Sequence, residues 1–413
     1  MPLSMRPLRH RRAALLLSTL LGGSAMLVSC SNRDGVAEGP INLKTGVPVG
    51  AVLALSGNAN VYGQDQRLGL NLALAGVNGS GGINGTPLRL SIEDSGSDDP
   101  GANAAMTLQI NRGRLAVIGP TLSQQAFAAD PIAQRRGVPV VAPSNTATGI
   151  PQIGHFISRV SASSDVIAPL SIAKALQLQP GIERAAVFFA QDDAYSTAET
   201  AVFQKALAAK GLKPVTVQRT NLADSDFQSQ ISATLALKPD LIVLSLQGVD
   251  GGNLVRQLRE LGYKGTIVVG NGMNTPNIYP ICQKYCDGLL IAQAYSPELP
   301  TPANKAFVKA FTANQSRSGQ TALIPPQLTA QAYTALQVVA EALQRLDQRT
   351  PLKGLSLAAA RKGLMDEILG GTYQTPLGEI RFTPDGEVIQ ENFYVAQVRM
   401  NPGGRSGRFA LLP

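Results

Sequence analysis

The sequence predicts an α/β protein of two domains whose sheets are mainly parallel, and three observations lead to this prediction. Short apolar runs alternate with helical segments over residues 49–294, which is the order of strands and helices in a parallel sheet. After a flexible N-terminal segment, the rest of the 413-residue chain is too long for one ordinary core. The tail departs from this alternation, because residues 303–369 contain successive helical segments with little between them.

In the first half of the chain, each expected element has a local reason. Residues 49–55 form an apolar strand, and a Gly- and Asn-rich turn carrying Tyr62 leads into a helix over residues 64–78. Asp99 and Pro100 supply a cap and a first-turn proline to the next helix, which ends at Arg112. The remaining elements of this half are strands over residues 88–93, 115–118 and 138–141 and a helix over residues 124–135.

The second half repeats the same alternation before the tail begins. Its expected strands cover residues 185–190, 215–217, 241–246, 266–269 and 288–294, and its helices cover 197–210, 227–237 and 252–261. The tail helices cover residues 303–314, 327–346 and 357–369. Two final strands, over 378–382 and 392–399, are expected to be joined by a turn at Asp385 and Gly386.

The stretch over residues 115–146 combines two strands with two polar turns. In a parallel sheet both turns would lie at the carboxyl edge, where ligands of open α/β sheets bind. Ser123 stands at the expected N-cap of a helix, and Ser144 and Thr146 follow the second strand. Hydroxyls, free backbone N–H groups and the positive end of a helix suit a small carboxylate. The alternative is that Ser123 is only a cap and Thr146 only a turn residue.

The N-terminus predicts export. Four arginines precede an apolar segment over residues 13–28 that is too short and too rich in Gly and Ser to span a membrane. It ends in Leu-Val-Ser-Cys30, which resembles the lipobox of bacterial lipoproteins, whose cysteine thiol carries the lipid. We expect residues 1–29 to be a lipoprotein signal peptide, Cys30 to be lipidated and residues 30–46 to be a flexible tether. An ordinary cleaved signal with a chance cysteine is the alternative.

Charge, cysteine and histidine usage narrow the classes of partner and cofactor. Without the four leader arginines, 32 Lys and Arg stand against 28 Asp and Glu, and they are too scattered to indicate nucleic-acid binding. Cys282 and Cys286 could form a disulfide or remain free thiols, and an oxidising compartment favours the disulfide. We expect no metal and no cofactor, because His155 is the only histidine after the leader and no second cysteine pair exists.

Several sequence motifs occur in a specific order. They are VLALSGNANVYGQDQRLGLNLALAGVNGSGGINGTPLRLSIEDSGSDDP, VIGPTLS, GVPVVAPSNT, GEIRF and DGEV. Together they resemble type I periplasmic binding proteins of the branched-chain amino acid (Leu/Ile/Val-binding) group, over nearly the whole stretch from Val47 to Val398. The resemblance implies two Rossmann-like lobes joined by three crossings, which close like a clamshell on a ligand for a membrane importer.

The resemblance also implies lobe boundaries and roles for individual residues. The N-terminal lobe would be residues 47–162 plus 296–375 and the C-terminal lobe 163–295 plus 376–413, with crossings near Ser161, Tyr295 and Thr375. Ser123, Ser144 and Thr146 match residues that hold the ligand carboxylate, and the Ser144 carbonyl matches one that accepts from the α-ammonium. Tyr62 matches an aromatic of the side-chain pocket, and Tyr195 matches a tyrosine of the facing lobe. Both tyrosines could instead be packed surface aromatics.

The sequence departs from the family where the ligand's ammonium is usually paired. The family commonly has an acid in the turn that corresponds to Gly270–Asn274, but this chain has no carboxylate there. Asp250 could supply the charge, Asn271 could bind through its carbonyl, or the ligand is not an α-amino acid. The neighbouring turn contributes Gln247, where an aromatic is often found.

These observations predict a binding protein and not an enzyme. The chain has neither a Gly-x-Ser-x-Gly elbow nor a Gly-Lys dipeptide for a P-loop, and His155 is better explained as a structural or surface residue than as a general base. We expect a monomeric, lipid-anchored periplasmic protein that captures a small carboxylate-bearing solute, most simply a neutral or branched-chain amino acid, and delivers it to the permease of an ABC importer. The alternatives are a ligand-sensing receptor of the same fold and a binder of an amide, urea or aromatic acid.

Overall fold

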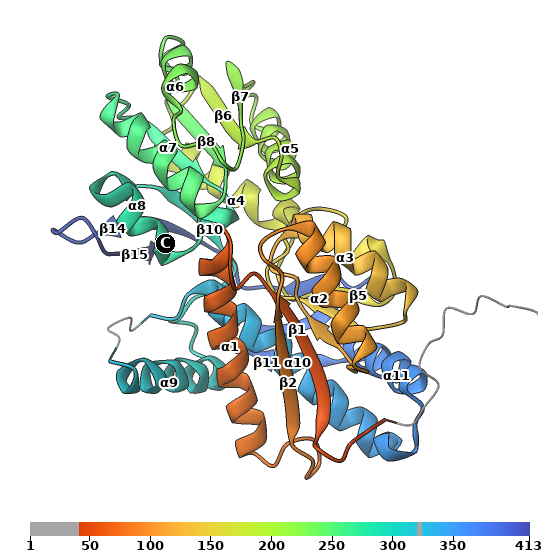
Figure 1. Cartoon of the computed structure of the whole chain (residues 1–413). Helices are drawn as coiled ribbons and strands as arrows, with labels where there is room; N and C mark the ends of the chain where they lie inside the picture. The colour runs from red at the N-terminus through yellow and green to blue at the C-terminus, as the bar shows by residue number, and fades with distance from the viewer. Residues whose placement is uncertain (1–40, 320–323) are drawn as a thin grey trace, which may run out of the picture. The chain divides into compact units, whose positions relative to one another are not determined.

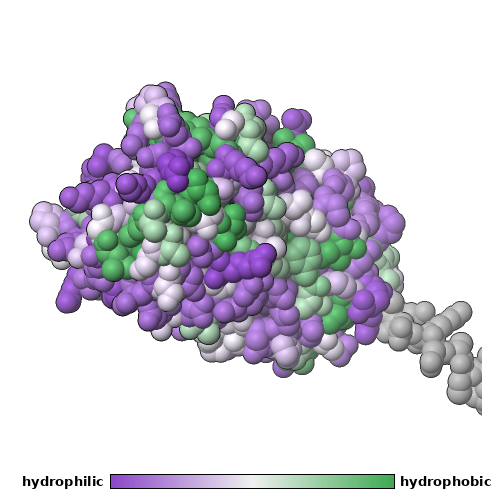
Figure 2. Space-filling model, turned by 90° about the horizontal axis from the view of Figure 1, so that it is seen from above, coloured by the Kyte–Doolittle hydropathy of each residue, from purple (hydrophilic) through white to green (hydrophobic). Residues whose placement is uncertain are grey.

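The computed structural model describes residues 41–319 and 324–413. The expected signal peptide, the lipidation site Cys30 and most of the expected tether lie outside these residues. Within residues 41–319 and 324–413, no helix combines the length and the apolar character needed to cross a membrane. Figure 2 shows polar residues over most of the visible face, interrupted by smaller apolar patches.

The first sheet has five parallel strands in the order β2-β1-β3-β4-β5 (Figure 1). Its strands are β1 (Val47–Leu53), β2 (Leu88–Asp94), β3 (Val117–Ile118), β4 (Val140–Ala142) and β5 (Ile157–Arg159). The helices between them are α1 (Asn60–Gly79), α2 (Asp99–Asn111) and α3 (Ser123–Arg135). The strand order reverses between β1 and β3, so the carboxyl ends of these two strands border a topological switch point.

The second sheet has seven strands in the order β15-β14-β10-β9-β8-β6-β7. The parallel part consists of β6 (Ala185–Ala190), β7 (Thr216–Thr220), β8 (Leu241–Ser245), β9 (Thr266–Val269) and β10 (Leu290–Gln293). The antiparallel part consists of β14 (Tyr394–Met400) and β15 (Gly407–Leu411). The helices of this lobe are α4 (Ser164–Leu178), α5 (Ala194–Ala209), α6 (Gln228–Leu235), α7 (Gly248–Glu260) and the short α8 (Tyr279–Cys282). The parallel strands are rich in fully buried aliphatic residues such as Val243 and Ile267. This composition is typical of a parallel sheet that is covered on both faces.

The tail helices pack with the first lobe. They are α9 (Pro302–Arg317), α10 (Gln327–Arg349) and α11 (Leu357–Gly370). Leu336, Leu343 and Leu364 are buried in the same apolar core as Val49 and Leu53 of β1. Helix α10 lies beside α1, as Figure 1 also shows. The apolar stripe of α10 therefore finds its partner far back in the sequence.

A third sheet corrects the expected lobe boundary near Thr375. It joins β11 (Thr372–Thr375), β12 (Gly378–Phe382) and β13 (Val388–Gln390) in antiparallel pairs. Tyr373, Ile380 and Phe382 belong to the core of the first lobe, so the segment over residues 376–390 packs mainly there. Val388 also packs against a small cluster that includes Ala292 of the second lobe. The turn at Asp385 and Gly386 accordingly joins β12 to β13, and the chain crosses to the second sheet only after Gln390. The bounds predicted for β12 are correct, but the strand that follows the turn and pairs with it is β13 and not the predicted strand over 392–399.

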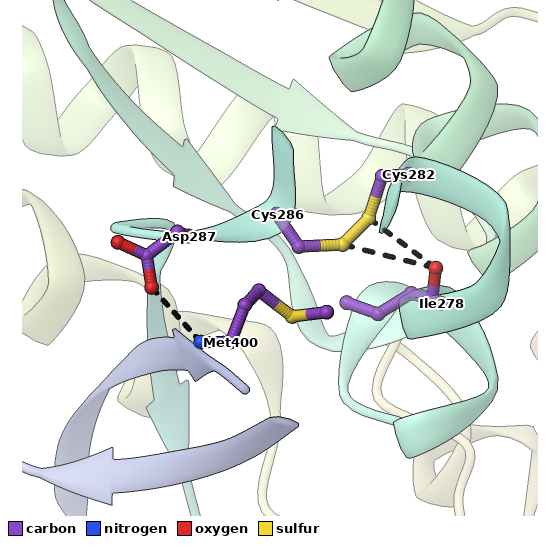
Figure 3. The surroundings of a disulfide bond; sticks show 5 residues. All are labelled: Ile278, Cys282, Cys286, Asp287 and Met400. Atoms are coloured by element: carbon purple, nitrogen blue, oxygen red, sulfur yellow. Dashed lines mark hydrogen bonds between the residues drawn. A yellow bond between two sulfur atoms is a disulfide. The ribbon is translucent and has the colours of Figure 1, made fainter. Parts of the chain in front are cut away.

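Cys282 and Cys286 are joined by a disulfide (Figure 3). Both residues are fully buried, and their sulfurs lie 3.3 and 3.7 Å from the carbonyl oxygen of Ile278. The adjoining Asp287 carboxylate accepts a hydrogen bond from the Met400 backbone N–H at 2.9 Å. This segment therefore ties α8 to the antiparallel strand β14.

Candidate functional site

A small cavity lies where the turns after β1, β3 and β4 face the turns of the second lobe. Its volume is about 40 Å³, and none of the described residues that line it carries a charge. The lining residues are Tyr62, Thr121, Leu122, Ser123, Ser144, Thr146, Tyr195, Gln247, Asn271, Gly272 and Leu328. The structure thus brings together every ligand-binding residue expected from the sequence except Asp250. A volume of this size accommodates roughly three water-sized groups, so the two lobes meet closely around it.

The turn after β3 reaches the cavity because Gly119 allows it to pass close to β1. Gly119 has a φ of +123°, and a Cβ there would lie 2.1 Å from the Val52 carbonyl oxygen. Ser123 is the first residue of α3, and Leu122 occupies the N-cap position, so Ser123 is not the cap that the sequence suggested. Its Oγ instead accepts a hydrogen bond from the Ala147 backbone N–H at 3.3 Å. The Ser123 proton therefore remains free to be donated into the cavity at the positive end of α3.

Thr146, in the turn after β4, presents a second free hydroxyl. The residue is only 2 % exposed, and its Oγ1 has no hydrogen-bond partner among the described residues. Its backbone carbonyl accepts from the Ser164 N–H at 2.9 Å, which fixes the turn without using the side chain. A buried hydroxyl without a partner costs about 1–3 kcal/mol. Such a group at the wall of a cavity is suited to donate to a ligand oxygen.

Ser144 is half-buried, and its hydroxyl is already bonded within the protein. Its Oγ donates to the Thr121 carbonyl at 2.7 Å and accepts from Gln66 Nε2 at 2.7 Å. Gln66 in turn accepts from Thr121 Oγ1 at 2.6 Å. These bonds link the turns after β3 and β4 to α1, so the Ser144 side chain fixes the position of one turn relative to the other. The sequence suggested a ligand-binding hydroxyl at Ser144, and the structure shows that this hydroxyl already has two protein partners.

A buried arginine that does not line the cavity holds the turn after β4 through its backbone carbonyls. Arg159 is 1 % exposed and donates to the carbonyls of Asn145 and Ala147 at 2.9 and 2.7 Å. It also makes two bonds with the Glu387 carboxylate, at 2.8 and 2.6 Å. Bidentate pairing of this kind fixes the guanidinium plane. Arg159 therefore connects the turn after β4 to the β12–β13 turn of the third sheet.

Tyr62 links the first lobe to the second across the cavity. Its hydroxyl donates to the Gly272 carbonyl at 2.7 Å and accepts from the Gly248 N–H at 2.5 Å. Burial raises the pKa of Tyr62 far above its usual value, so the hydroxyl keeps its proton. The alternative of a packed surface aromatic does not hold for Tyr62, because the side chain is 7 % exposed and bonded to the other lobe.

Tyr195 and Asn271 form the wall on the second lobe. Tyr195 donates to Glu199 Oε2 at 2.6 Å and accepts from the Gly272 N–H at 2.5 Å. Asn271 lies in the 3₁₀ helix η2 (Asn271–Met273), and its Oδ1 accepts from Gln327 Nε2 of the first lobe at 3.0 Å. The side-chain oxygen of Asn271 is thus already engaged by the protein. An amide oxygen has two lone pairs, so Asn271 Oδ1 retains one acceptor site beside this interlobe bond.

Gln247 reaches the cavity from the N-cap position of α7, and its Nε2 donates to the Asp193 carboxylate at 3.1 Å. Asp250, by contrast, is not a lining residue. It lies in the first turn of α7, is 2 % exposed, and burial raises the pKa of its carboxyl to about 8. The protonated form of Asp250 is therefore favoured near neutral pH, and the residue does not line the cavity, in contrast to the role that the sequence suggested for it.

A larger cavity of about 910 Å³ lies beyond the Asn271–Gln327 bond. Gln327 and Asn274 line this cavity, whereas Leu328 and Asn271 line the smaller one. The start of α10 and the η2 segment therefore separate the two spaces. The smaller cavity is the better candidate site, because the carboxyl ends of the strands and the helix N-terminus converge on it.

Sequence reasoning missed several residues of the site, although two of them carried a signal. Gln66 and Glu199 each follow an expected tyrosine, Tyr62 and Tyr195, by four positions on a helix, which places them on the same helical face. Thr121, Leu122 and Leu328 carry no comparable pattern. Within the described residues, no group of three or more His, Cys, Asp or Glu side chains is arranged to hold a metal ion.

Comparison with known proteins agrees with this architecture. A family model described as "Periplasmic binding protein" matches residues 46–405. The leucine-, isoleucine-, valine-, threonine- and alanine-binding protein of Pseudomonas aeruginosa is 25% identical over 345 residues, which are 83% of this chain and 87% of that protein. A leucine-binding protein from Thermotoga maritima has a TM-score of 0.77 at 25% identity, covering 89% of this chain and 98% of its own.

A further structural neighbour has a different ligand in its printed description. It is a solute-binding protein of an ABC transporter from Rhodopseudomonas palustris in complex with 3,4-dihydroxybenzoic acid. Its TM-score is 0.75 at 20% identity, and the match covers 88% of this chain and 96% of that one. At this identity the likeness shows the fold alone.

Proposed function

This chain belongs to the periplasmic binding protein family, and we propose that it captures a small carboxylate-bearing solute and presents it to the permease of an ABC importer. It does so as an exported protein that is anchored through a lipid on Cys30, and it binds the solute without converting it. Relatives that match most of the chain are named as amino-acid-binding proteins, which supports this assignment. The lipobox-like sequence before Cys30 supports the anchor.

One observation carries the carboxylate assignment. Thr146 has a buried hydroxyl without a partner, Ser123 has a free proton at the start of α3, and both line the same uncharged cavity. The first N–H groups of a helix have no intrahelical partner and add to the local positive potential. A carboxylate accepts several such hydrogen bonds, and each contributes roughly 1.5–3 kcal/mol.

The first candidate ligand is a neutral amino acid such as leucine. The relatives from Pseudomonas aeruginosa and Rhizobium johnstonii are both named for branched-chain amino acids. The cavity walls formed by Leu122, Leu328 and Tyr62 are compatible with an aliphatic side chain once the lobes separate. Hinge motion in such proteins changes the volume between the lobes.

A second candidate is a carboxylate that lacks an ammonium group. Asn271 Oδ1 is engaged by Gln327, and no charged residue lines the cavity among the described residues. An ammonium buried without a charged partner is costly. A structural neighbour in complex with 3,4-dihydroxybenzoic acid is an example of such a ligand on the same fold.

Titration calorimetry with L-leucine and with 4-methylpentanoate, the same molecule without the amino group, tests the proposal. Binding of either compound at a stoichiometry of one supports a carboxylate site, and a preference for leucine selects the first candidate. If neither compound, nor benzoate, nor any of a panel of neutral amino acids binds the purified protein, the carboxylate assignment is wrong. A receptor role instead of transport would show as intact uptake and a lost response in a gene deletion.

A further inference from the structure

A buried carboxylate lies directly behind the cavity wall of the second lobe. Glu199 is on α5, four residues after Tyr195, and it is 1 % exposed. None of the ion pairs formed among residues 41–319 and 324–413 involves it. A carboxylate without a cation is costly to bury. The hydrogen bonds that Glu199 accepts must therefore offset the cost of burying it.

Both Glu199 oxygens are directed at residues that line the cavity. Oε1 accepts from the Asn271 backbone N–H at 3.0 Å, and Oε2 accepts from the Tyr195 hydroxyl at 2.6 Å. The Tyr195 oxygen itself accepts from the Gly272 N–H at 2.5 Å. Glu199 thus holds two successive backbone groups of the η2 segment, one directly and one through Tyr195.

The backbone beside Glu199 leaves room for the carboxylate. A Cβ at Gly270 would lie 1.7 Å from Glu199 Oε2 and 2.7 Å from the Tyr195 hydroxyl. Any other residue at position 270 would therefore displace the carboxylate. The turn over residues 270–274 has no carboxylate of its own, but Gly270 packs against the carboxylate of Glu199 from α5.

We propose that Glu199 is the positioning residue that supplies the negative charge for a ligand ammonium in the small cavity, acting through the Tyr195 hydroxyl. This inference rests on the proposed function. Tyr195 lines the cavity, and its oxygen retains one lone pair after accepting from Gly272. A hydroxyl that donates to a carboxylate becomes a stronger acceptor, because hydrogen bonds in a chain polarise one another. The ammonium is then stabilised by Tyr195 and by the buried charge behind it.

The protonation behaviour of Glu199 supports this role. Burial raises the pKa of its carboxyl to about 7, so the group is partly protonated near neutral pH. The other ionisable groups that act on it are Tyr195 and Asp193 at the start of α5, whereas the facing η2 segment offers only backbone N–H groups. A nearby ammonium favours the ionised form of Glu199 and lowers its pKa. Ligand binding near pH 7 should therefore release protons.

The test compares Glu199→Gln with the wild type for two ligands, L-leucine and 4-methylpentanoate. Glutamine keeps the size of the side chain and removes the charge. We expect a 10- to 100-fold loss of leucine affinity and less than a threefold change for 4-methylpentanoate. Tyr195→Phe should show the same selective loss. Asp250→Asn, a change of the same kind at another buried acid of this lobe that does not line the cavity, should change neither affinity.

The other outcomes overturn the inference in distinguishable ways. Equal losses for both ligands would show that Glu199 only holds the fold, and no loss would show that its charge is not used. Wild-type protein that binds both compounds equally has no ammonium subsite, although the carboxylate site stands. Wild-type protein that binds benzoate but no amino acid likewise has no ammonium subsite. If neither these compounds nor any of the panel of neutral amino acids binds, both proposals are refuted. If Glu199→Gln does not fold, wild-type calorimetry in phosphate and Tris buffers decides, because absence of proton release on leucine binding at pH 7 contradicts the proposal.

Discussion

The hydroxyl of Tyr62 lies 2.7 Å from the carbonyl oxygen of Gly272, although the two residues are 210 positions apart in the sequence. The first residue belongs to α1 of the first lobe, and the second belongs to η2 of the second lobe. The same hydroxyl accepts from the Gly248 N–H at the start of α7. One side chain therefore bonds to two turns of the opposite lobe, and these bonds stabilise the close approach of the two lobes.

The first prediction concerns this link. Tyr62→Phe removes the bond to Gly272 and leaves the Gly248 N–H without its partner in the closed form. The closed form should lose about 1–2 kcal/mol, and ligand affinity should fall roughly tenfold. Calorimetry measures the affinity, and small-angle scattering should show a more open protein at subsaturating ligand.

Tyr263→Phe is the matched control. The Tyr263 hydroxyl also donates to a backbone carbonyl, that of Thr266 at 3.0 Å, but both residues are in the second lobe. The control should change stability without changing affinity. Equal affinities for wild type and Tyr62→Phe would mean that the link does not contribute to closure.

The second prediction concerns the free hydroxyl in the turn after β4. Thr146→Val replaces a buried hydroxyl that has no partner with a methyl group of similar shape. Stability without ligand should stay the same or rise, whereas affinity should fall by roughly 10- to 100-fold because a bond to a charged ligand is lost. Thr148→Val is the control, since the Thr148 hydroxyl bonds to Asp165 and does not line the cavity. Unchanged affinity in Thr146→Val would exclude this hydroxyl from the site.

The third prediction concerns the buried ion pair behind the same turn. Glu387→Gln leaves the Arg159 guanidinium buried without its carboxylate partner, which should lower the free energy of unfolding by about 3 kcal/mol. Glu93→Gln breaks the more exposed pair with Arg112 and should cost less than about 1 kcal/mol. Chemical denaturation measures both variants. Similar small losses in the two would indicate that the Arg159–Glu387 pair adds little to stability.

The fourth prediction concerns the pH dependence of stability. Asp130 on α3 is fully buried, both of its carboxylate oxygens lack partners among the described residues, and burial raises its pKa well above the usual value. The folded state then retains a proton that the unfolded state loses above about pH 4, so stability falls as pH rises from that point toward the folded-state pKa. Asp130→Asn removes this loss and should raise stability at pH 7 relative to the wild type.

Thermal unfolding between pH 4 and pH 8 measures this effect. The difference between Asp130→Asn and wild type should be small at pH 4 and should grow with pH. Glu391→Gln, a change at an exposed acid that forms no ion pair among the described residues, is the control and should show no comparable growth. A constant difference across the range would mean that Asp130 is ionised in the folded protein.

The fifth prediction concerns the anchor. Cys30→Ala removes the thiol that we propose carries the lipid, so the exported protein should move from the membrane pellet to the soluble periplasmic fraction. Ser31→Ala, at the next position, should remain in the membrane fraction. Retention of Cys30→Ala in the pellet after a salt wash would refute lipidation at this residue.

Much of the site could be predicted because its residues follow strands that are recognisable locally. Ser123, Ser144 and Thr146 come shortly after apolar runs, and parallel pairing of β3 with β4 brings their turns to one edge of the sheet. Asp250 was misplaced because its distance from the preceding strand resembled that of a turn residue. The register of α7 buries it, and side-chain direction on a helix is set by packing that the local sequence does not reveal.

The amino-acid sequence by itself determined the alternation of strands and helices, the polar turns at the strand ends and the signal-like N-terminus, because each depends on neighbouring residues. Only the tertiary structure decided that residues 376–390 pack mainly with the first lobe. It also decided that Gln327 donates a hydrogen bond to the Asn271 side-chain oxygen and that Glu199 accepts one from the Tyr195 hydroxyl. The partners in the Asn271–Gln327 and Tyr62–Gly272 bonds are 56 and 210 positions apart. Such pairings depend on how the two lobes pack, and no local pattern specifies them.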